Sequence, residues 1–539
     1  MTITTRRGHL VQLMRKAGGV LGAILSASLV IATSTTSLAA ASQQKRTEKP
    51  VHGGILQAAT TQTPGTLDPN LNTAFAEFYI AELVYGSLMQ RGITQSKIEL
   101  GDASSYTHPN PTTYTFTLRK GLEFSNGQPV TSADVKFSFD RLITPKVASP
   151  WASDFQVITS IDTPSPSTVV FHLKTPFAPF LSYLSEPTYA PIISPTEVAK
   201  YGNLKSHALG TGPFELVNYT PGVSVILKRN PHYWQKGLPY LNGIDLKIIT
   251  TTSTRLAALE SGEVNLAWFI TARIGQRVPA SSGLKVLYPK LETNEQTIIM
   301  NQTKAPFNNV DVRRAVSEAI TRKQIINVVL AGHGTVGSKI PPGEKPYGYN
   351  GPMKGLPYNV YNPKNAKLLL KKAGYPRGFS TVLNTTTLPE TGQTATLVKS
   401  QLKKVGITVR INKQTHNVLL THYVHTTYTG MAMDLLVWQP DPDTDVYDIM
   451  YSSSAINLGK FDSPKVDALL NKARTEQTIR ARARTYIELE KYVATQAYMI
   501  FPFDRLAAAQ VITPNVHGYQ AENSGLHEAA LLHTWLSKR

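Results

Sequence analysis

The sequence lacks cysteine altogether: none of its 539 residues is Cys. This absence excludes disulfide bonds, thiol nucleophiles, cysteine-ligated zinc, iron–sulfur clusters and a lipid on an N-terminal Cys. Acidic residues are also scarce, with 36 Asp and Glu against 55 Lys and Arg, so the formal net charge is +19. The remaining composition, with 41% hydrophobic residues in a long chain, is typical of a folded protein with two or three domains.

The N-terminal segment has the pattern of an export signal. Residues 1–19 are basic, Val20–Val30 is an apolar run, and Ala39–Ala41 offers the small residues that signal peptidase requires. A membrane anchor is the alternative, but the apolar run is too short for a span of about 20 residues. We therefore expect a signal peptide at 1–41, a polar tether at 42–50, and a mature protein that is free in the periplasm without a lipid anchor. That location argues against nucleic acid as the partner of the basic charge.

From Val51 onward, strand and helix patterns interleave. Alternating apolar side chains predict a strand at 114–118, and Thr131 with Asp134 predicts a capping box on the helix that follows. Thr321 and Gln324 predict a second capping box. Further strands are expected at 223–228 and 244–249, and further helices at 252–261, 311–320 and 363–373. This interleaving predicts an α/β chain in more than one lobe.

No motif for a cofactor or for catalysis is both complete and in a suitable sequence context. Gly332–Gly337 matches a dinucleotide fingerprint, but prolines soon after it prevent the helix that would bind the phosphates. His527 and Glu528 with His533 resemble a zinc-protease motif. The second His, however, stands at i+6, whereas only i+4 brings both imidazoles onto one helical face. No GxSxG elbow occurs. We expect neither a cofactor nor catalysis.

Three histidines, His416, His422 and His425, lie within ten residues. They could hold a transition metal or haem. The alternative is that they are polar residues scattered around an amphipathic helix. The sequence leaves both interpretations open, and we expect no metal as the simpler case.

The stretch that follows Trp438 is unusually acidic for this chain, with Asp441, Asp443, Asp445 and Asp448. It lacks the Gly and Glu positions of a calcium-binding EF-hand loop. A carboxylate beside an indole can hold a ligand ammonium group through a charge-assisted hydrogen bond and a cation–π contact. Alternatively, the acids and two prolines form a solvated turn.

Several long segments, taken in order, resemble one family. The segments are Thr66–Pro69 (TLDP), 114–142 (YTFTLRKGLEFSNGQPVTSADVKFSFDRL), 210–222 (GTGPFELVNYTPG), 227–241 (LKRNPHYWQKGLPYL), 253–265 (STRLAALESGEVN), 301–342, 361–379, Trp438–Asp443 and 461–474 (FDSPKVDALLNKAR). They look like the family 5 extracellular solute-binding proteins, of the dipeptide, oligopeptide and nickel-binding type. The resemblance covers essentially the whole mature chain.

This resemblance implies an α/β, two-lobed type II periplasmic-binding-protein fold, a Venus-flytrap, with an extra subdomain in its first lobe. Lobe I would comprise 51–297, with the subdomain at about 83–208, and lobe II 298–506. The segment 507–539 would return to lobe I. By the same resemblance the protein binds a solute between its lobes and delivers it to an inner-membrane ABC permease with its ATPase subunits. It would act as a monomer and perform no chemistry.

The resemblance also suggests site residues. In peptide-binding members an Asp three residues after the cleft Trp receives the ligand's amino terminus, and Asp441 follows Trp438 at that spacing. Asp441 fits equally as the first acid of the family's Asp-Pro-Asp, which Asp443 completes. Further candidates for the cleft wall, with core packing as the alternative, are Asn70, Thr73, Phe75 and Trp268.

The ligand expected from the resemblance is a di- or oligopeptide. A nickel complex, haem or another non-peptide solute bound by the same fold is the first alternative. An exported hydrolase of unrecognised type is the second. The sequence fixes neither the length of the ligand nor its side-chain preference.

Overall fold

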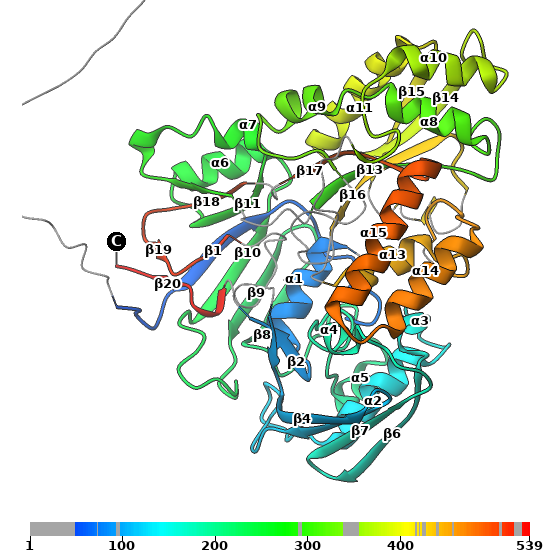
Figure 1. The fold of residues 1–539 in the computed structure, drawn as a ribbon. Coiled ribbons are helices and arrows are strands. Elements are labelled where there is room, and N and C mark those ends of the chain that lie inside the picture. The colour runs from blue at the N-terminus through cyan, green and yellow to red at the C-terminus, as the bar shows by residue number, and fades with distance from the viewer. Residues whose placement is uncertain are drawn as a thin grey trace, which may run out of the picture. The chain divides into compact units, whose positions relative to one another are not determined.

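The computed structural model describes residues 49–538 apart from 73, 93–96, 289–293, 338–354, 416–417, 420, 423–426, 438–440, 455–456, 506–508 and 522–530. The fold described below is that of the compact unit that begins at Pro50 (Figure 1). The expected export signal lies outside the described residues. Among the described helices, none combines the length and the apolar character needed to pass through a bilayer.

Lobe I is built on a seven-stranded sheet with the order β12-β18-β11-β1-β10-β9-β8. Its central strand, β1 (Ile55–Thr60), pairs in parallel with β10 (Gly243–Ile248) and β11 (Leu266–Ile270). The other strands are β8 (Phe214–Thr220), β9 (Ser224–Arg229), β12 (Lys285–Leu287) and β18 (Ala509–Ile512). β18 comes from near the C-terminus and lies between β11 and β12, so the chain ends in the lobe where it began.

Short elements complete lobe I. Its helices are α1 (Phe75–Val84), α6 (Thr252–Glu260) and α7 (Ala272–Gly275), with the 3-10 turn η1 (Ala280–Ser282). A two-stranded sheet joins β19 (Val516–His517) to β20 (Trp535–Leu536). The core between α1 and the sheet contains Tyr79, Leu246 and Trp268.

The extra subdomain is a four-stranded antiparallel sheet, β4-β5-β7-β6, with its own aromatic core. Its strands are β4 (Ala103–Asn110), β5 (Thr113–Leu118), β6 (Ile158–Ser165) and β7 (Thr168–Leu173). Its helices are α2 (Ser132–Ile143), α3 (Ala152–Phe155), α4 (Phe180–Tyr183) and α5 (Pro195–Tyr201). The hairpin of β2 (Met89–Arg91) and β3 (Ile98–Leu100) precedes the sheet.

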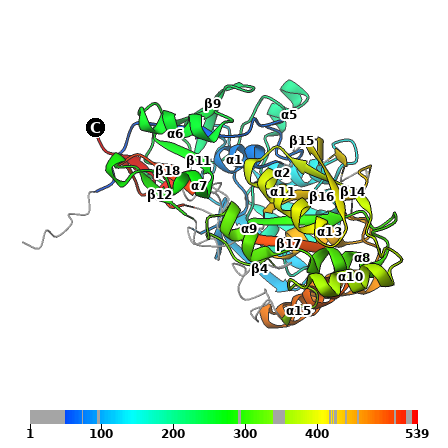
Figure 2. The same ribbon diagram turned by 90° about the horizontal axis from the view of Figure 1, so that it is seen from above.

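Lobe II is built on a five-stranded sheet with the order β15-β14-β16-β13-β17. Its strands are β13 (Asn294–Met300), β14 (Ser380–Thr386), β15 (Thr408–Gln414), β16 (Met431–Val437) and β17 (Met499–Arg505). Its helices are α8 (Val310–Glu318), α9 (Arg322–Val329), α10 (Pro363–Lys372), α11 (Pro389–Lys403), α13 (Asp443–Met450), α14 (Pro464–Thr475) and α15 (Ile479–Gln496). One core packs α8 to α11 on the sheet and another packs α13 to α15, so helices cover both faces (Figure 2).

The structure confirms most of the elements expected from periodicity. In β5, Tyr114, Phe116 and Leu118 are buried, and on α2 the predicted face of Val135, Phe139 and Leu142 is buried as well. The Asp134 carboxylate accepts the Thr131 N–H at 2.7 Å, which is the reciprocal bond of a capping box.

The second expected capping box is wrong. The Thr321 N–H bonds to Oε1 of Gln401 at 3.0 Å, and Gln401 also donates to Gln324. Because Gln401 reaches from α11, a distant side chain supplies the cap that the local pattern assigned to Gln324. The glycine-rich run at 332–337 follows α9 without entering a helix, and the residues after it lie outside the description.

Along the chain, β12 of lobe I is followed by β13 of lobe II, and β17 of lobe II is followed by β18 of lobe I. β13 and β17 pair antiparallel. Residues 289–293 and 506–508, between these strands, lie outside the description. The residue boundaries expected for the lobes and the subdomain stay predictions.

Candidate functional site

A pocket of about 50 Å³ is lined by residues of both lobes, and we call it the interlobe pocket. Lobe I contributes Thr61, Gln62, Thr250, Thr252, Arg255, Phe269 and Thr271, and lobe II contributes Gln296, Leu388, Pro389, Glu390, Thr391, Leu435 and Phe503. Many of these residues directly follow the C-terminal ends of β1, β10, β11 and β14. Ligands of open α/β sheets bind at those ends, so this pocket is the candidate site.

Arg255 fixes the lobe I wall of the pocket. Its buried guanidinium donates to the carbonyl oxygens of Trp268, Ile249, Thr250 and Phe269 and to the Thr252 hydroxyl, at 2.6–3.2 Å. Burial lowers the pKa of Arg255 to about 10, so it remains charged at neutral pH. One side chain therefore joins the ends of β10 and β11.

Phe269 lines the interlobe pocket, and its neighbour Trp268 does not. Trp268 is 1% exposed in the lobe I core, where it stacks on Tyr79 and donates to the Tyr519 hydroxyl at 2.9 Å. Phe269 has a φ of +56° at an irregularity in the register of β11. This break in strand alternation places Phe269 at the pocket, and the ligand contact expected of Trp268 stays a prediction.

Buried polar atoms without a hydrogen-bond partner among the described residues lie close to the pocket. They are the hydroxyls of Thr60, Thr385 and Thr386 and Oε1 of Gln296. Gln296 lines the pocket, whereas Thr60 and Thr386 are the last residues of β1 and β14. Buried polar groups are rarely left unpaired in native proteins, so each one calls for a partner.

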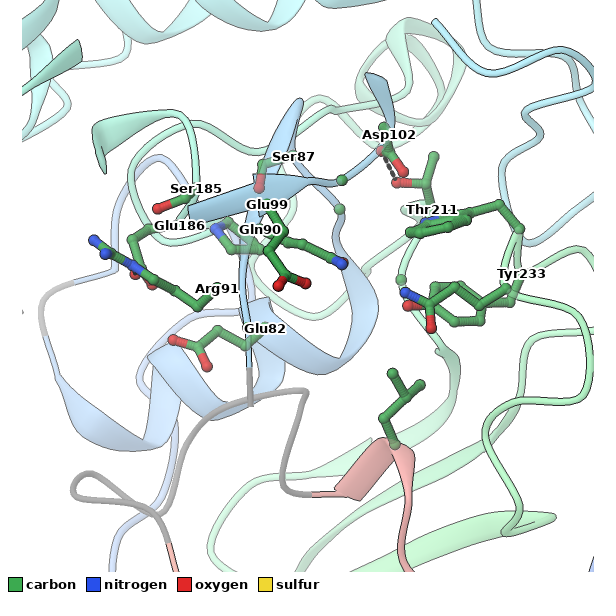
Figure 3. Close-up of a pocket in the computed structure, with 18 of the residues that line it drawn as sticks. Glu82, Ser87, Gln90, Arg91, Glu99, Asp102, Ser185, Glu186, Thr211 and Tyr233 are labelled. Carbon is green, nitrogen blue, oxygen red and sulfur yellow. Dashed lines mark hydrogen bonds and ion pairs between the residues drawn. The ribbon is translucent and has the colours of Figure 1, made fainter. Parts of the chain in front are cut away.

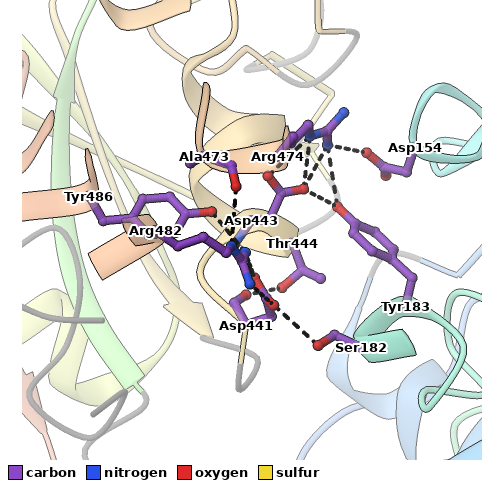
Figure 4. Close-up of polar contacts among 10 residues, drawn as sticks. All are labelled: Asp154, Ser182, Tyr183, Asp441, Asp443, Thr444, Ala473, Arg474, Arg482 and Tyr486. Atoms are coloured by element: carbon purple, nitrogen blue, oxygen red, sulfur yellow. Dashed lines mark hydrogen bonds and ion pairs between the residues drawn. The ribbon is translucent and has the colours of Figure 1, made fainter. Parts of the chain in front are cut away.

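Asp441 forms an ion pair within lobe II (Figure 4). Arg482 of α15 donates to both of its carboxylate oxygens, at 2.8 and 2.5 Å, and Ser182 of the subdomain donates at 3.2 Å. Burial acts to raise the pKa of Asp441, but the charge and hydrogen bonds of Arg482 leave that pKa lowered. Arg482 is thus bonded to both oxygens of the carboxylate that we expect to receive a ligand ammonium group. That ammonium-binding role of Asp441 stays a prediction.

Asp443 joins lobe II to the subdomain. Nε of Arg474 lies 3.0 and 2.9 Å from its two carboxylate oxygens, and the Tyr183 hydroxyl donates to it at 3.2 Å. Arg474 also donates to Asp154 of α3 at 3.0 Å. The two carboxylates of the Asp-Pro-Asp turn are therefore both bound to arginines of the helices that follow.

The remaining wall candidates are placed only in part. Asn70 is buried and accepts a hydrogen bond from Arg141, which also forms a bidentate pair with Asp68. Thr73, the Phe75 side chain, Trp438 and the Asp445 side chain lie outside the description. The turn at 66–70 is thus tied to α2, and the ligand contacts expected of these residues stay predictions.

The histidine cluster is described at one position. Nδ1 of His422 lies 2.6 Å from the Thr427 hydroxyl, whereas His416 and His425 fall outside the described residues. No group of three potential metal ligands occurs in the part of the chain that the structure describes. The metal interpretation of the three histidines stays a prediction.

A second pocket, of about 160 Å³, lies within lobe I and its subdomain (Figure 3). Arg91 extends between Glu82 and Glu186 in this pocket, and its Nε lies 2.6 Å from the Glu186 carboxylate. Asp102 accepts a hydrogen bond from Thr211, and burial raises the pKa of Asp102 to about 7. Every described residue that lines this pocket belongs to lobe I, its subdomain or the C-terminal segment.

Sequence analysis missed Arg255, Phe269, Arg474 and Arg482. The sequence does contain a signal for Arg482. Its helical spacing to Tyr486, Leu489 and Val493 places it on the buried apolar face of α15. A charged residue at an apolar position of an amphipathic helix predicts a buried partner. No comparable sequence signal marks Phe269.

Comparison with curated proteins finds relatives over part of the chain. The glutathione-binding protein GsiB of Salmonella choleraesuis is 34% identical over 301 residues, 56% of this chain and 57% of that protein. GsiB of an Escherichia coli strain is 34% identical over 312 residues, 57% of this chain and 60% of that protein. The chain thus spans less than two thirds of the length of these relatives.

Solved structures match over most of the chain. The periplasmic binding protein DppA of Helicobacter pylori, in complex with the peptide STSA, has a TM-score of 0.82 and 25% identity over 90% of this chain and 99% of that one. AppA of Bacillus subtilis, solved with a nonapeptide, has a TM-score of 0.81 and 22% identity, over 91% and 100% of the two chains. These likenesses confirm the two-lobed type II periplasmic-binding-protein fold.

The family itself is settled by a match over residues 97–457 to the model described as bacterial extracellular solute-binding proteins, family 5 Middle. That range contains the subdomain strands, the passage into lobe II and the acidic turn. The chain belongs to the family 5 bacterial extracellular solute-binding proteins.

Proposed function

We propose that this protein is the substrate-binding component of an ABC importer and that it captures short peptides between its two lobes. The observation that carries this proposal is a set of buried polar atoms that have no hydrogen-bond partner among the described residues. They belong to Gln296, which lines the pocket between the lobes, and to Thr60, Thr385 and Thr386 at the ends of β1 and β14. A peptide backbone has one donor and one acceptor per residue, so it can pair with these atoms while its side chains meet Phe269 and Phe503.

Two of the relatives support a peptide as the ligand. GsiB is named for glutathione, and DppA of Helicobacter pylori was solved with a bound peptide. The occupied carboxylate of Asp441 argues against a strict requirement for a free amino terminus, because Arg482 already neutralises it. Short peptides that make mainly backbone contacts are the ligand class that fits best.

The rest of the proposal combines what the family implies with the sequence, which has no Cys to carry a lipid. The mature protein would act in the periplasm as a monomer without a lipid anchor, and an inner-membrane permease with its ATPase subunits would receive the solute. It would release its ligand chemically unchanged, as a binding protein rather than an enzyme. Ligand exchange by opening and closing of the lobes is the step that the permease would read.

Thermal unfolding of the purified mature protein tests the ligand class. Glutathione, dipeptides and tetrapeptides would be added separately, each with its free amino acids as the matched control. A ligand at a hundredfold its dissociation constant adds about 2.7 kcal/mol to the unfolding free energy. We expect a rise in melting temperature with peptides and none with the amino acids.

A nickel–histidine complex and haem serve as further arms of the same experiment. A shift with either of them, and none with any peptide, would remove the peptide assignment and leave the fold's binding role intact. Mass spectrometry of the incubated peptides would reveal cleavage, and turnover at a useful rate would favour the exported hydrolase instead.

A further inference from the structure

Lobe II and the subdomain meet in a buried group of charged side chains, which we call the interlobe cluster. It consists of Asp154 of α3, Tyr183 of α4, Asp443, Tyr447 and Asp448 of α13, and Arg474 of α14. The Arg474 guanidinium lies 3.0 Å from the centre of the Tyr447 ring. The Arg474 carbonyl oxygen accepts the N–H of Ala178, in the subdomain, at 2.7 Å. The bond from Ala178 joins the subdomain to lobe II, as do the bonds of Arg474 to Asp154 and of Tyr183 to Asp443. Closing of the lobes would bring these same two bodies together.

The cluster holds more carboxylates than cations. The side chains of Asp154, Asp443 and Asp448 are at most 2% exposed, and Arg474 is the guanidinium that bonds to two of them. Two other arginines form ion pairs with acids outside the cluster: Arg482 with Asp441, and Arg91 with Glu186. With every acid ionised, the cluster therefore carries an excess of buried negative charge, which is costly in a dry environment.

The excess falls on Asp154 and Asp448. The Nε–H of Arg474 donates to the Asp443 carboxylate, and a terminal N–H of Arg474 donates one hydrogen bond to Oδ1 of Asp154. Oδ2 of Asp154 and Oδ2 of Asp448 have no hydrogen-bond donor among the described residues. Burial raises the pKa of both groups, and for Asp448 the adjacent Asp154 raises it further, well above the usual value. A single proton held between the two carboxyl groups would supply the missing donor and remove one charge.

We propose that closing of the two lobes traps one proton between Asp154 and Asp448, so that mild acid favours the closed form. In the open form both groups meet water and are ionised at neutral pH. Closing takes one proton from the solvent and leaves one carboxyl group bonded to one carboxylate, and opening returns that proton. This inference rests on the proposed function only in taking closure as the event that accompanies ligand binding.

The direction of the pH effect follows from linkage. Between the ordinary carboxyl pKa near 4 and the raised value in the closed form, closing consumes a proton, so the closed-to-open ratio rises up to about tenfold for each unit that the pH falls. Above the raised value the closed form lacks the proton and the ratio stays low. An ordinary buried ion pair such as Asp441–Arg482 has the opposite dependence, because acid weakens it.

Closure can be measured without any ligand by energy transfer between two dyes. The chain has no Cys, so exposed Lys146 on the subdomain and exposed Lys399 on α11 can be labelled after substitution to Cys. We expect transfer to increase as the pH falls from 8 to 5. In the same background, Asp448→Asn replaces the shared proton with an amide donor, and we expect high transfer at every pH. Asp102→Asn, which removes a buried acid inside lobe I, is the matched control and keeps the response to pH.

Transfer that is constant from pH 8 to 5, or that falls in acid, would overturn the proposal. An Asp448→Asn variant that still responds like the parent would do the same. Small-angle scattering of the unsubstituted protein over this range gives the same answer without a change in the cluster, so a misfolded variant does not leave the question open. Because no peptide is added, a failure here leaves the peptide proposal standing, and a failure to bind peptides leaves this measurement valid.

Discussion

Some of the arginines that make this chain basic have a structural role as single buried residues. Arg255, Arg313 and Arg322 are buried, and they bond to backbone carbonyl oxygens rather than forming ion pairs with described acids. Burial lowers the pKa of each to about 10, which leaves them charged at neutral pH. The planar guanidinium can satisfy several carbonyls at once, so it joins strand and helix ends that have no acid nearby. A chain poor in acids can therefore still bury cations.

Asp441 offers the sharpest test at this scale. We expect Asp441→Asn to lower the free energy of unfolding by about 3 kcal/mol, because it leaves the buried charge of Arg482 without its partner. Urea denaturation at neutral pH measures the change. Asp140→Asn is the matched control, since Asp140 pairs with Lys136 on the surface and its loss should cost less than about 1 kcal/mol.

The same variant separates the two interpretations of Asp441. If its role is the ion pair with Arg482, ligands with a free amino terminus and N-acetylated ligands lose affinity equally. A loss confined to ligands with a free amino terminus would instead establish Asp441 as the ammonium anchor. Titration calorimetry with one peptide in both forms distinguishes these outcomes.

Elements were predictable from sequence where the signal is local. The alternation in β5 and the capping box at Thr131 depend on neighbours within a few residues, and both are confirmed. The cap at Thr321 was wrong because Gln401 comes from another helix. Likewise, the pairing of Asp441 and Asp443 with arginines depends on how α13, α14 and α15 pack, which periodicity does not encode.

The N-cap of α15 gives a prediction at the scale of elements. The Thr478 hydroxyl accepts the Ala481 N–H at 3.2 Å and begins the helix that carries Arg482. We expect Thr478→Ala to lower the free energy of unfolding by about 1 kcal/mol. Thr478→Ser keeps the hydroxyl and should be close to the parent in urea denaturation. An equal loss in both variants would show that the methyl group, and not the cap, matters.

At the scale of the whole molecule, buried acids with raised pKa values lie in two regions of the fold. Asp102 lies within lobe I and its subdomain, Glu82 beside the same pocket, and Asp448 in the interlobe cluster. Burial is the main cause of each increase. Such groups favour the folded state in mild acid, because the folded chain keeps protons that the unfolded chain releases. A protein with these acids should lose stability toward alkaline pH.

Asp102 makes this testable, because burial raises its pKa to about 7 while the Thr211 hydroxyl and the charge of Arg119 oppose the increase. Its contribution to stability is full below the unfolded pKa of about 4 and is lost as the pH rises through 7. Between those values the parent should lose up to about 1.4 kcal/mol of unfolding free energy per pH unit through this group, and Asp102→Asn should not. Urea denaturation of both proteins at pH 5, 6, 7 and 8 measures the difference. Repulsion within the cationic chain affects both alike, so a difference that stays constant across this range would mean that Asp102 is ionised in the folded protein throughout.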